Sequence, residues 1–314
     1  MLGDALQFVK MHGAGNDFVL LDVLKPQTVL ESGSFVDDAR WARLAREMCD
    51  RHFGIGSDGL LLALPSTIAD ARMRMFNPDG SESASCGNGI RCLGRYVRDR
   101  YGLGAGDLRV ETGAGVTTIS VLDGGMVTVN MGLPVFAPAQ IPTAFSGDDA
   151  LDESITVGSD RIPIGCVSMG NPHAVTFVEP GALDAYPLET IGPKVERHPS
   201  FPERTNFEVC EVVAPDHMRV RVWERGAGVT LACGTGACAS TVVATRAGRI
   251  RPPIRLELPG GTLTINWAPG EPVLMTGPTE YVFAGTYPMP SWWSKPGETS
   301  GEARIAKREA AVVG

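Results

Sequence analysis

Short runs in which hydrophobic and polar positions alternate make up much of the chain, and glycine and proline separate them at close intervals. Alternation with a period of two predicts half-buried strands, and the glycines and prolines between them predict tight turns. The predicted strands are 18–23, 60–64, 72–76, 108–112, 116–122, 126–131, 166–169, 174–178, 207–213, 219–223, 255–258, 262–267 and 273–276.

Three segments have the spacing of helices instead. In 38–49, apolar side chains recur every three or four residues, while 90–101 and 237–246 each follow a Cys-Gly-x-Gly turn. Because helices are few among many strands, the pattern favours an α+β fold over a doubly wound parallel sheet.

Composition along the chain predicts where its parts divide. The segment 132–154 is rich in proline, alanine and serine, which is typical of a boundary between domains. Beyond 288 the chain is polar and proline-containing, although Trp292 and Trp293 are candidates for packing back on the body. We therefore expect an N-terminal domain at 1–134, a C-terminal domain at 135–272, a last strand near 273–287 that returns to the first domain, and a flexible tail at 288–314.

The two halves of the chain resemble each other. A shift of 147 residues places Arg72-Met-Arg-Met-Phe76 on Arg219-Val-Arg-Val-Trp223 and, without a gap, Cys86-Gly-Asn-Gly89 on Cys233-Gly-Thr-Gly236. The order strand, turn, Cys-Gly-x-Gly, helix therefore occurs twice. It predicts two similar domains related by a pseudo-two-fold axis, with a cleft that presents the same group to both faces of one carbon.

Composition and charge narrow the class of partner. Of 314 residues, 43% are hydrophobic and 20% are charged, with a net charge of −8 and no basic run of five. Such a chain is an ordinary globular protein, and we expect neither nucleic acid nor an anionic membrane as its partner. The N-terminus lacks the apolar core of a signal peptide, and no window of 18 apolar residues exists, so we expect a cytoplasmic protein.

Cysteines are the strongest candidates for chemistry. Cys86 and Cys233 each precede a glycine at a predicted helix start, where unpaired N–H groups and the helix dipole favour a thiolate. A lone cysteine in this place is more often a packing residue, but two at matching positions of a repeat favour function. The same helix starts could hold a carboxylate through the backbone N–H groups of Gly87, Asn88, Gly234 and Thr235. The other five cysteines have no such context, and we interpret them as packing residues: Cys49, Cys92, Cys166, Cys210 and Cys238.

Several polar residues have both a structural and a functional interpretation. Glu224-Arg225 is either a solvated ion pair or a clamp for the charged far end of a substrate, and His173 is either a core histidine or a group that tunes a thiol. Four asparagines lie in turns, where they could form the turn or line a polar cleft: Asn16, Asn77, Asn171 and Asn206.

The motifs together resemble the diaminopimelate epimerase family over roughly residues 8 to 287. The matching segments are Met11-His-Gly-Ala-Gly-Asn-Asp-Phe18, Phe76-Asn-Pro-Asp-Gly-Ser-Glu82, Cys86-Gly-Asn-Gly-Ile-Arg-Cys92, Gly170-Asn-Pro-His173, Trp223-Glu-Arg-Gly226 and Ala232-Cys-Gly-Thr-Gly-Ala237.

The resemblance implies two similar domains, each of β-sheets wrapped around a central helix. It also implies interconversion of LL- and meso-2,6-diaminopimelate, on the route to lysine and peptidoglycan, without pyridoxal phosphate or metal. By position, Cys86 and Cys233 would be the acid and base thiols, with His173 and Glu224 tuning them. Substrate would be bound by Asn16, Asn77, Gly87, Asn88, Asn171, Asn206, Glu224, Arg225, Gly234 and Thr235. One residue departs from the family pattern, since Gly59 stands where many members carry glutamine.

Other functions remain open at this point. A proline or hydroxyproline racemase would use the same paired thiols, but would need no clamp for a charged far end. A non-catalytic protein that binds an amino acid or phosphate at the helix starts would tolerate loss of either thiol. A metal–thiolate protein is disfavoured because no Cys-x-x-Cys occurs. We expect no metal and no cofactor, a small-molecule substrate and a homodimer.

Overall fold

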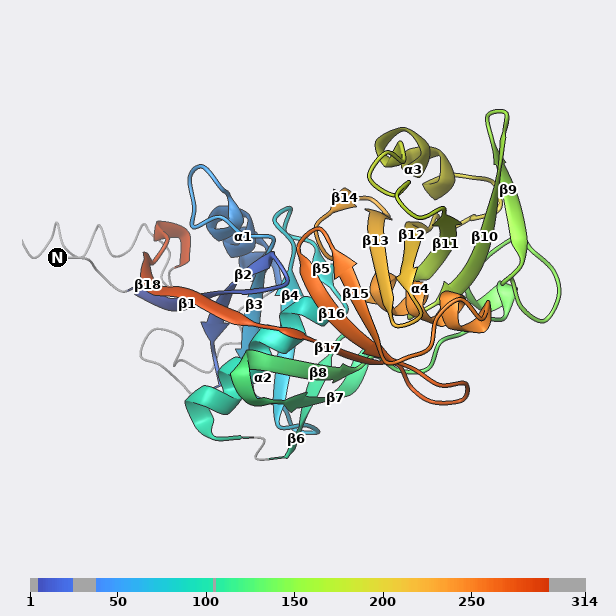
Figure 1. Ribbon diagram of the computed structural model, residues 1–314. Helices are drawn as coiled ribbons and strands as arrows, with labels where there is room; N and C mark the ends of the chain where they lie inside the picture. Colours follow the sequence, from blue (N-terminus) through green and yellow to red (C-terminus); the bar gives the residue numbers. More distant parts are fainter. Residues whose placement is uncertain (1–4, 25–37, 104–105, 294–314) are drawn as a thin grey trace, which may run out of the picture.

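The computed structural model describes residues 5–24, 38–103 and 106–293, whose strands join into one hydrogen-bonded sheet folded into two halves (Figure 1). The first half contains β1 (Ala5–Gly13), β2 (Asn16–Asp22), α1 (Asp38–Cys49), β3 (Gly59–Leu64), β4 (Ala71–Phe76), β5 (Glu82–Ser83), α2 (Gly87–Tyr101), β6 (Asp107–Thr112), β7 (Gly115–Val121) and β8 (Met126–Asn130). The second contains β9 (Glu153–Val157), β10 (Asp160–Ser168), β11 (Pro172–Val178), α3 (Leu188–Glu196), β12 (Asn206–Ala214), β13 (His217–Glu224), β14 (Gly228–Thr230), α4 (Gly234–Arg246), β15 (Ile254–Leu258), β16 (Gly261–Asn266) and β17 (Leu274–Pro278). These elements give the α+β fold expected from the pattern.

Strand pairing confirms the internal repeat. In the first half, β2 pairs in parallel with β3, β3 pairs antiparallel with β4, and β4 pairs in parallel with β6. In the second half, β11, β12, β13 and β15 repeat the same sequence of pairings. The register also repeats, because Phe18 lies opposite Gly59 as His173 lies opposite Asn206. Equivalent positions of the two halves can therefore be compared residue by residue.

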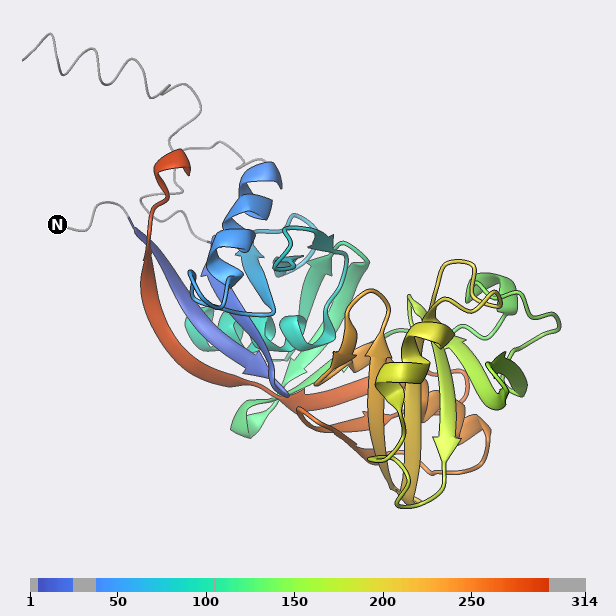
Figure 2. The ribbon, with the colours of Figure 1, turned by 90° about the horizontal axis from the view of Figure 1, so that it is seen from above.

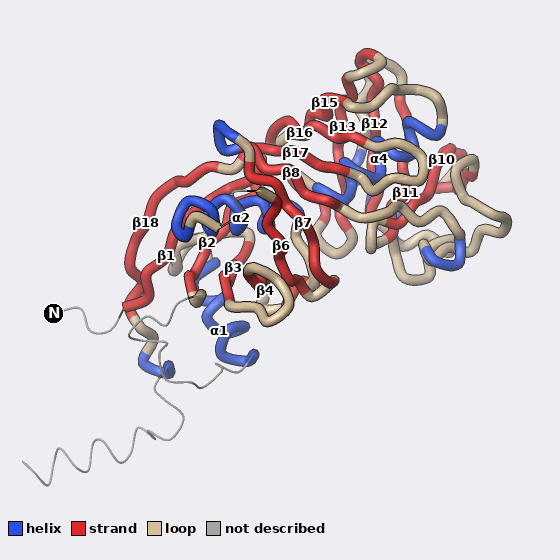
Figure 3. The backbone as a smooth tube through the Cα atoms, turned by 90° about the horizontal axis from the view of Figure 1, so that it is seen from below, coloured by secondary structure: helices blue, strands red, loops and turns tan. Residues whose placement is uncertain are grey.

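Two contacts between distant strands complete the sheet. The antiparallel pairing of β8 with β17 joins the two halves at the centre of the molecule (Figure 3). The last strand, β18 (Glu280–Pro288), pairs antiparallel with β1, and the two run side by side along the first half (Figure 2). β10 is the counterpart of β1 in the second half, and it pairs with β9. β18 in the first half therefore corresponds to β9 in the second.

A helix lies at the centre of each half. α2 packs against β1–β4 and β6–β8, and α4 packs against β10–β13 and β16. α4 has no exposed face between Gly236 and Ala244, since these residues, Ser240 and Thr241 included, are all buried, as expected for a helix enclosed by strands. This enclosure presents only the N-terminal end of each central helix to the region between the halves.

The structure adds elements that the sequence pattern did not predict: β1, β5, β9, α3 and β14. α3 carries Pro193 inside it, which removes a backbone donor and obscures the helical pattern. The helix forms nevertheless because Leu188 and Val195 are buried against the second half. Both central helices also begin three residues earlier than predicted, directly after Cys86 and Cys233.

The first residues of the predicted tail pack on the body. Trp293 is buried and its ring lies 5.3 Å from that of Trp41 in α1, which confirms that this end packs back on the body. Residues 294–314, the rest of the predicted tail, lie outside the described residues. The domain limits at 134 and 272 stay a prediction. Within the described part of the chain, no helix is both long and apolar enough to cross a membrane.

Candidate active site

Cys86 and Cys233 are the N-caps of the two central helices. Both have extended backbone conformations, and each sulfur accepts a hydrogen bond from the third residue of its helix. The Gly89 N–H lies 3.4 Å from the Cys86 Sγ, and the Gly236 N–H lies 3.3 Å from the Cys233 Sγ. A thiol thus takes the capping place that serine, threonine or aspartate usually fills.

The two helix starts lie close together. A Cβ added at Gly87 would lie 2.9 Å from the Met275 Cε, and one added at Gly234 would lie 3.2 Å from the same atom. The Asn88 side chain, in the first turn of α2, donates to the carbonyl of Ala232 at 3.1 Å, just before Cys233. The structure therefore brings together both cysteines and the N–H groups that we assigned to a carboxylate.

Burial raises the pKa of both thiols, and the carboxylate of Glu224 raises the pKa of each further. The backbone N–H groups at the helix starts lower both values, as we expected, but they do not outweigh burial. Burial therefore opposes the thiolate that the helix starts favour, and the role of the two thiols stays a prediction. All seven cysteines are free thiols.

The negative charge of Glu224 acts on both thiols and raises the pKa of each. Its carboxylate accepts a hydrogen bond from Thr230 and interacts with the Cys233 thiol, while burial raises its own pKa. A carboxyl group with a raised pKa beside a thiol can exchange a proton with it near neutral pH.

A chain of hydrogen bonds runs from Cys233 into the core. The Cys233 Sγ lies 3.5 Å from the Thr235 hydroxyl, which accepts from the Asn171 amide at 3.4 Å. The Asn171 Oδ1 lies 2.9 Å from the His173 Nε2, and the His173 Nδ1 lies 2.7 Å from the Glu208 Oε1. His173 and Glu208 have no solvent-exposed surface. His173 is therefore linked to the thiol and does not serve packing alone.

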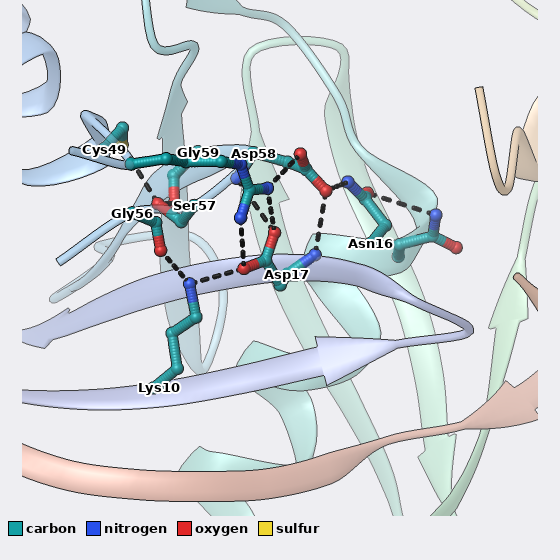
Figure 4. Close-up of polar contacts among 10 residues, drawn as sticks. Lys10, Asn16, Asp17, Cys49, Gly56, Ser57, Asp58 and Gly59 are labelled. Carbon is teal, nitrogen blue, oxygen red and sulfur yellow. Dashed lines mark hydrogen bonds and ion pairs between the residues drawn. The ribbon is translucent and has the colours of Figure 1, made fainter. Parts of the chain in front are cut away.

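Asn16 belongs to a polar cluster on the side of Cys86. It donates to Asp58 at 2.7 Å and accepts from Asn88 at 3.2 Å. Asp58 also lies 2.8 Å from Arg51, and Asp17 accepts from the same guanidinium at 2.7 Å (Figure 4). The cluster holds Asn16 against the first turn of α2.

The other substrate-binding candidates form hydrogen bonds with backbone groups or lie in turns at the surface. Asn206 donates to the Pro172 carbonyl at 3.0 Å and accepts from the Arg225 backbone at 2.8 Å. The Arg225 guanidinium is exposed and donates to the Glu203 carbonyl at 3.1 Å. Asn77 bonds to the Ser81 hydroxyl at 2.9 Å within its turn. Arg225 and Asn77 thus lie in partly or fully exposed turns after β13 and β4.

Gly59 lies in β3 where no side chain would fit without rearrangement. An added Cβ would lie 2.6 Å from the Met75 Cε and 3.1 Å from the Phe76 carbonyl oxygen. In the repeated register, its counterpart in the second half is Asn206. The first half therefore lacks the amide that the second half has at this place, and Met75 fills the space.

Three residues of the site were missed by reasoning from the sequence. Asp58 ends the run Gly54-Ile-Gly-Ser-Asp58, Glu208 interrupts an apolar strand, and Arg91 follows the Cys-Gly-x-Gly turn. A charged residue within an apolar run is the signal that could have indicated Glu208 and Arg91. Within the described ranges, no group of three or more His, Cys, Asp or Glu side chains could hold a metal ion.

Comparisons with known proteins agree on the fold and the family. The profile of the family described as diaminopimelate epimerase matches residues 8–137 and 165–282. Diaminopimelate epimerase of Carboxydothermus hydrogenoformans is 46% identical over 282 residues, which cover 90% of this chain and 99% of the relative. Diaminopimelate epimerase 1 of Nostoc sp. is 48% identical over 287 residues, with the same two coverages.

Solved structures with low sequence identity share the fold. A phenazine biosynthesis protein of the PhzF family from Bacillus anthracis superimposes with a TM-score of 0.64 at 19% identity, covering 90% of this chain and 99% of that one. A hydroxyproline epimerase from Agrobacterium vitis, with bound trans-4-OH-L-proline, gives a TM-score of 0.58 at 18% identity and covers 91% of this chain and 93% of that one. With its matched profile, its relatives and its paired helix-capping cysteines, the chain belongs to the diaminopimelate epimerase family.

Proposed function

We propose that this amino-acid epimerase interconverts LL- and meso-2,6-diaminopimelate by proton transfer between two thiols, with no cofactor, on the route to lysine and peptidoglycan precursors. The observation that carries the proposal is the pair of cysteines that cap two converging helices at equivalent positions of a repeat. Two related halves can present one thiol to each face of a single α-carbon.

The chemistry needs one thiolate and one thiol. In one direction Cys86 as thiolate removes the α-proton while Cys233 as thiol donates its proton to the opposite face, and in the reverse direction the roles exchange. One C–H bond breaks and one forms, so no oxidant or reductant is required. After turnover the proton lies on the other sulfur, which prepares the enzyme for the reverse reaction.

Glu224 is the group that we propose to help one thiol ionise. Its carboxylate acts on both thiols and its pKa is raised by burial, so it can take up the proton that Cys86 loses. The α-ammonium group of a bound substrate would add positive charge beside the sulfurs and favour the thiolate. His173, linked to Cys233 through Asn171 and Thr235, would tune the same equilibrium.

The helix starts provide the site for the reacting carboxylate. Backbone N–H groups of Gly87, Asn88, Gly234 and Thr235 lie at the positive ends of two helix dipoles, which favours an anion there. As the α-proton leaves, negative charge spreads onto this carboxylate, and the same donors stabilise it. Met275, buried between the two helix starts, helps to exclude water.

The far end of diaminopimelate carries a second ammonium and a second carboxylate. We propose that Arg225 binds this carboxylate, since its guanidinium is exposed beside the site. The amides of Asn16, Asn77, Asn171 and Asn206 would complete the recognition. A proline-type substrate has no charged far end, so this part of the site favours diaminopimelate.

The assembly and location are part of the same proposal. We propose a cytoplasmic homodimer in which β18 meets β18 of a second copy. β18 pairs with β1 along one edge only, and within the described residues no strand pairs with its other edge. Tyr281, Val282 and Phe283 on this strand are 40%, 53% and 48% exposed. Exposed apolar side chains along an unpaired strand are typical of an interface.

The direct test is exchange of the α-proton in deuterated water. The purified chain, with no cofactor added, is incubated with LL-diaminopimelate, and incorporation of deuterium and formation of the meso isomer are followed by NMR. L-Proline serves as the matched substrate control. We expect exchange with diaminopimelate and none with proline. Exchange with proline alone would replace the substrate assignment, and no exchange with either would overturn the catalytic proposal.

A further inference from the structure

The strand residues that pack against the first turns of the two central helices occupy corresponding positions but differ in charge. An added Cβ at Gly89 in α2 would lie 3.0 Å from a methyl carbon of Leu61, and one at Gly236 in α4 would lie 2.8 Å from the Glu208 Oε1. Leu61 and Glu208 are separated by the same 147 residues as the two cysteines, and both lie on equivalent strands. The first half has an apolar side chain where the second half has a fully buried acid.

Glu208 is not fully compensated. His173 lies 2.7 Å from Oε1, but Oε2 is buried and has no hydrogen-bond partner. The other titratable groups that act on Glu208 or feel its charge are Glu224 on β13, Cys233 at the start of α4, Cys166 on β10 and Cys210 on β12 itself. None of these four groups supplies a positive charge. Burial raises the pKa of Glu208, whereas His173 lowers it. An ionised Glu208 beside a neutral His173 places negative charge next to Cys233.

Arg91 provides the opposite charge in the first half. It is fully buried in α2, one turn after Cys86, where the equivalent residue of α4 is Cys238. Its guanidinium donates to the Asn88 Oδ1 at 2.8 Å and to the Gly87 carbonyl at 3.4 Å, while its Nε has no partner. Within the described residues Arg91 forms no ion pair with a carboxylate. Its positive charge is therefore directed at the first turn of α2.

We propose that these buried charges make the two thiols unequal: Arg91 favours loss of the proton from Cys86, and Glu208 keeps the proton on Cys233. This inference rests on the proposed two-thiol function, because only there does the order of ionisation matter. Burial and Glu224 raise the pKa of both thiols, but Arg91 lowers that of Cys86 whereas Glu208 raises that of Cys233 further. Arg91 and Glu208 are positioning residues that act through the cysteines and touch no substrate.

The consequence is a preferred resting form of the free enzyme. When one of the two thiols ionises, it is Cys86, and Cys233 remains the proton donor. The free enzyme is then prepared for the direction in which Cys86 is the base. After each turnover in that direction, the proton must return from Cys86 to Cys233 before the next substrate of the same configuration can react.

The test measures each thiol separately in the same molecule without substrate. Full-length protein is alkylated with iodoacetamide between pH 6 and pH 10, and modification is quantified by mass spectrometry of tryptic peptides. Peptide 75–91 contains Cys86 alone, and fragment ions of peptide 226–246 separate Cys233 from Cys238. The midpoint of each rate profile reports ionisation, whereas its plateau reports accessibility. We expect the Cys86 midpoint to lie below that of Cys233 by about one pH unit or more. A Cys233 rate that still rises at pH 10 places its midpoint above the measured range and agrees with this order.

Two variants assign the difference to its causes. Glu208→Gln should lower the Cys233 midpoint by about one unit and leave that of Cys86 in place, and Arg91→Met should raise the Cys86 midpoint. In Arg91→Met the tryptic peptide runs from 75 to 95, and fragment ions separate Cys86 from Cys92. Glu211→Gln is the matched control, because it neutralises a buried carboxylate on the same strand that is paired with Arg219 instead. It should move neither profile.

Midpoints in the reverse order, or profiles that cannot be separated in the wild-type protein, would overturn the inference even if a variant fails to fold. Equal shifts of both thiols in Glu208→Gln would also contradict it, since a merely structural role would affect them alike. The alkylation experiment uses no substrate. Its failure is therefore distinct from failure of the proton-exchange assay, which tests the proposed function itself.

Discussion

At the scale of single residues, the neighbours of a side chain decide its chemistry more than its type does. Cys86 and Cys233 occupy helix starts that favour thiolates, yet burial and Glu224 raise the pKa of both thiols. A reader of the sequence can identify the two cysteines from the repeat. The direction of their pKa shifts depends on the groups that surround them in the fold. One of these groups is Glu208, which acts on Cys233 although it is not a neighbour of Cys233 in the sequence.

Replacement of either thiol should abolish epimerisation. Cys86→Ser and Cys233→Ser retain the capping geometry, but a hydroxyl is far too weak an acid to serve as the thiolate base. We expect turnover to fall by at least about 10²–10⁴-fold, the usual contribution of a positioned general acid or base. Formation of the meso isomer from LL-diaminopimelate measures the effect. Ser85→Ala, at the exposed neighbour of Cys86, is the control, and near-normal activity in either cysteine variant would refute the two-thiol mechanism.

Asp17 should stabilise the fold in a pH-dependent way. Burial would raise its pKa, but hydrogen bonds with Arg51 and Lys10 outweigh burial and lower the pKa to about 2, from a model-compound value of 3.8 (Figure 4). Because the folded-state pKa is the lower one, the stabilisation is complete above pH 4 and is lost as pH falls towards 2. Partial exposure screens the charges, so Asp17→Asn should reduce the free energy of unfolding at pH 7 by about 1–2 kcal/mol.

Denaturant unfolding at pH 7, pH 4 and pH 2.5 tests this dependence. The difference between wild type and Asp17→Asn should shrink over the lower half of that range. Asp184→Asn, at a carboxylate that is 73% exposed and paired with Arg219, should change stability by less than about 0.5 kcal/mol. A difference for Asp17→Asn that stays constant down to pH 2.5 would contradict the charge network as its source.

At the scale of elements, α3 supports the strand that ends at the active site. Its Glu196 accepts a hydrogen bond from the Trp223 indole at 2.8 Å, and an added Cβ at Gly192 would lie 2.6 Å from the Trp223 Cγ and 2.8 Å from its Cβ. The Cβ of a strand residue cannot move without the backbone. Since Trp223 directly precedes Glu224, the packing of α3 on β13 determines where that carboxylate lies.

Gly192→Ala should therefore destabilise the protein and impair catalysis together. Overpacking against Trp223 costs about 1–3 kcal/mol, of which the better helix propensity of alanine offsets less than ~1 kcal/mol. Thermal unfolding and the epimerase assay measure the two effects. The control is Gly106→Ala, where a Cβ meets no atom within 4 Å and the change should be nearly neutral. Full stability with full activity in Gly192→Ala would show that α3 does not constrain β13.

At the scale of the whole molecule, β18 connects the C-terminal end of the fold to its N-terminal strand and leaves apolar side chains exposed. β1 and β18 pair although about 270 residues separate them, so the first half is complete only after the second has been made. The exposed side chains of Tyr281, Val282 and Phe283 lie on this late strand.

Phe283→Asp should break the proposed dimer, because a charge in an apolar strand interface remains unpaired and must be desolvated. Light scattering after size exclusion should give the mass of two chains for wild type and of one chain for the variant. Phe53→Asp replaces a side chain that is 93% exposed outside β18 and should leave the dimer intact. A wild-type monomer would disprove the homodimer, and a dimeric Phe283→Asp would place the interface elsewhere.

Features that depend on short-range pattern could be predicted from the sequence alone. Alternation indicated most strands, and the repeated Cys-Gly-x-Gly turn indicated both central helices, both thiols and the relation between the halves. Such features are local because strand and helix periodicity, and the preference of a helix start for an anion, involve only a few neighbouring residues.

Which distant elements meet, and what charge surrounds each thiol, depends on the folded arrangement of the whole chain. The pairing of β8 with β17, the burial of α3 despite Pro193, and the placement of Glu208 beneath α4 involve partners far apart in the chain. A periodic pattern shows that a face is buried but not against what, and the energy of a charge depends on its burial and its partners in space. The two thiols are therefore alike in the sequence and unequal in the fold.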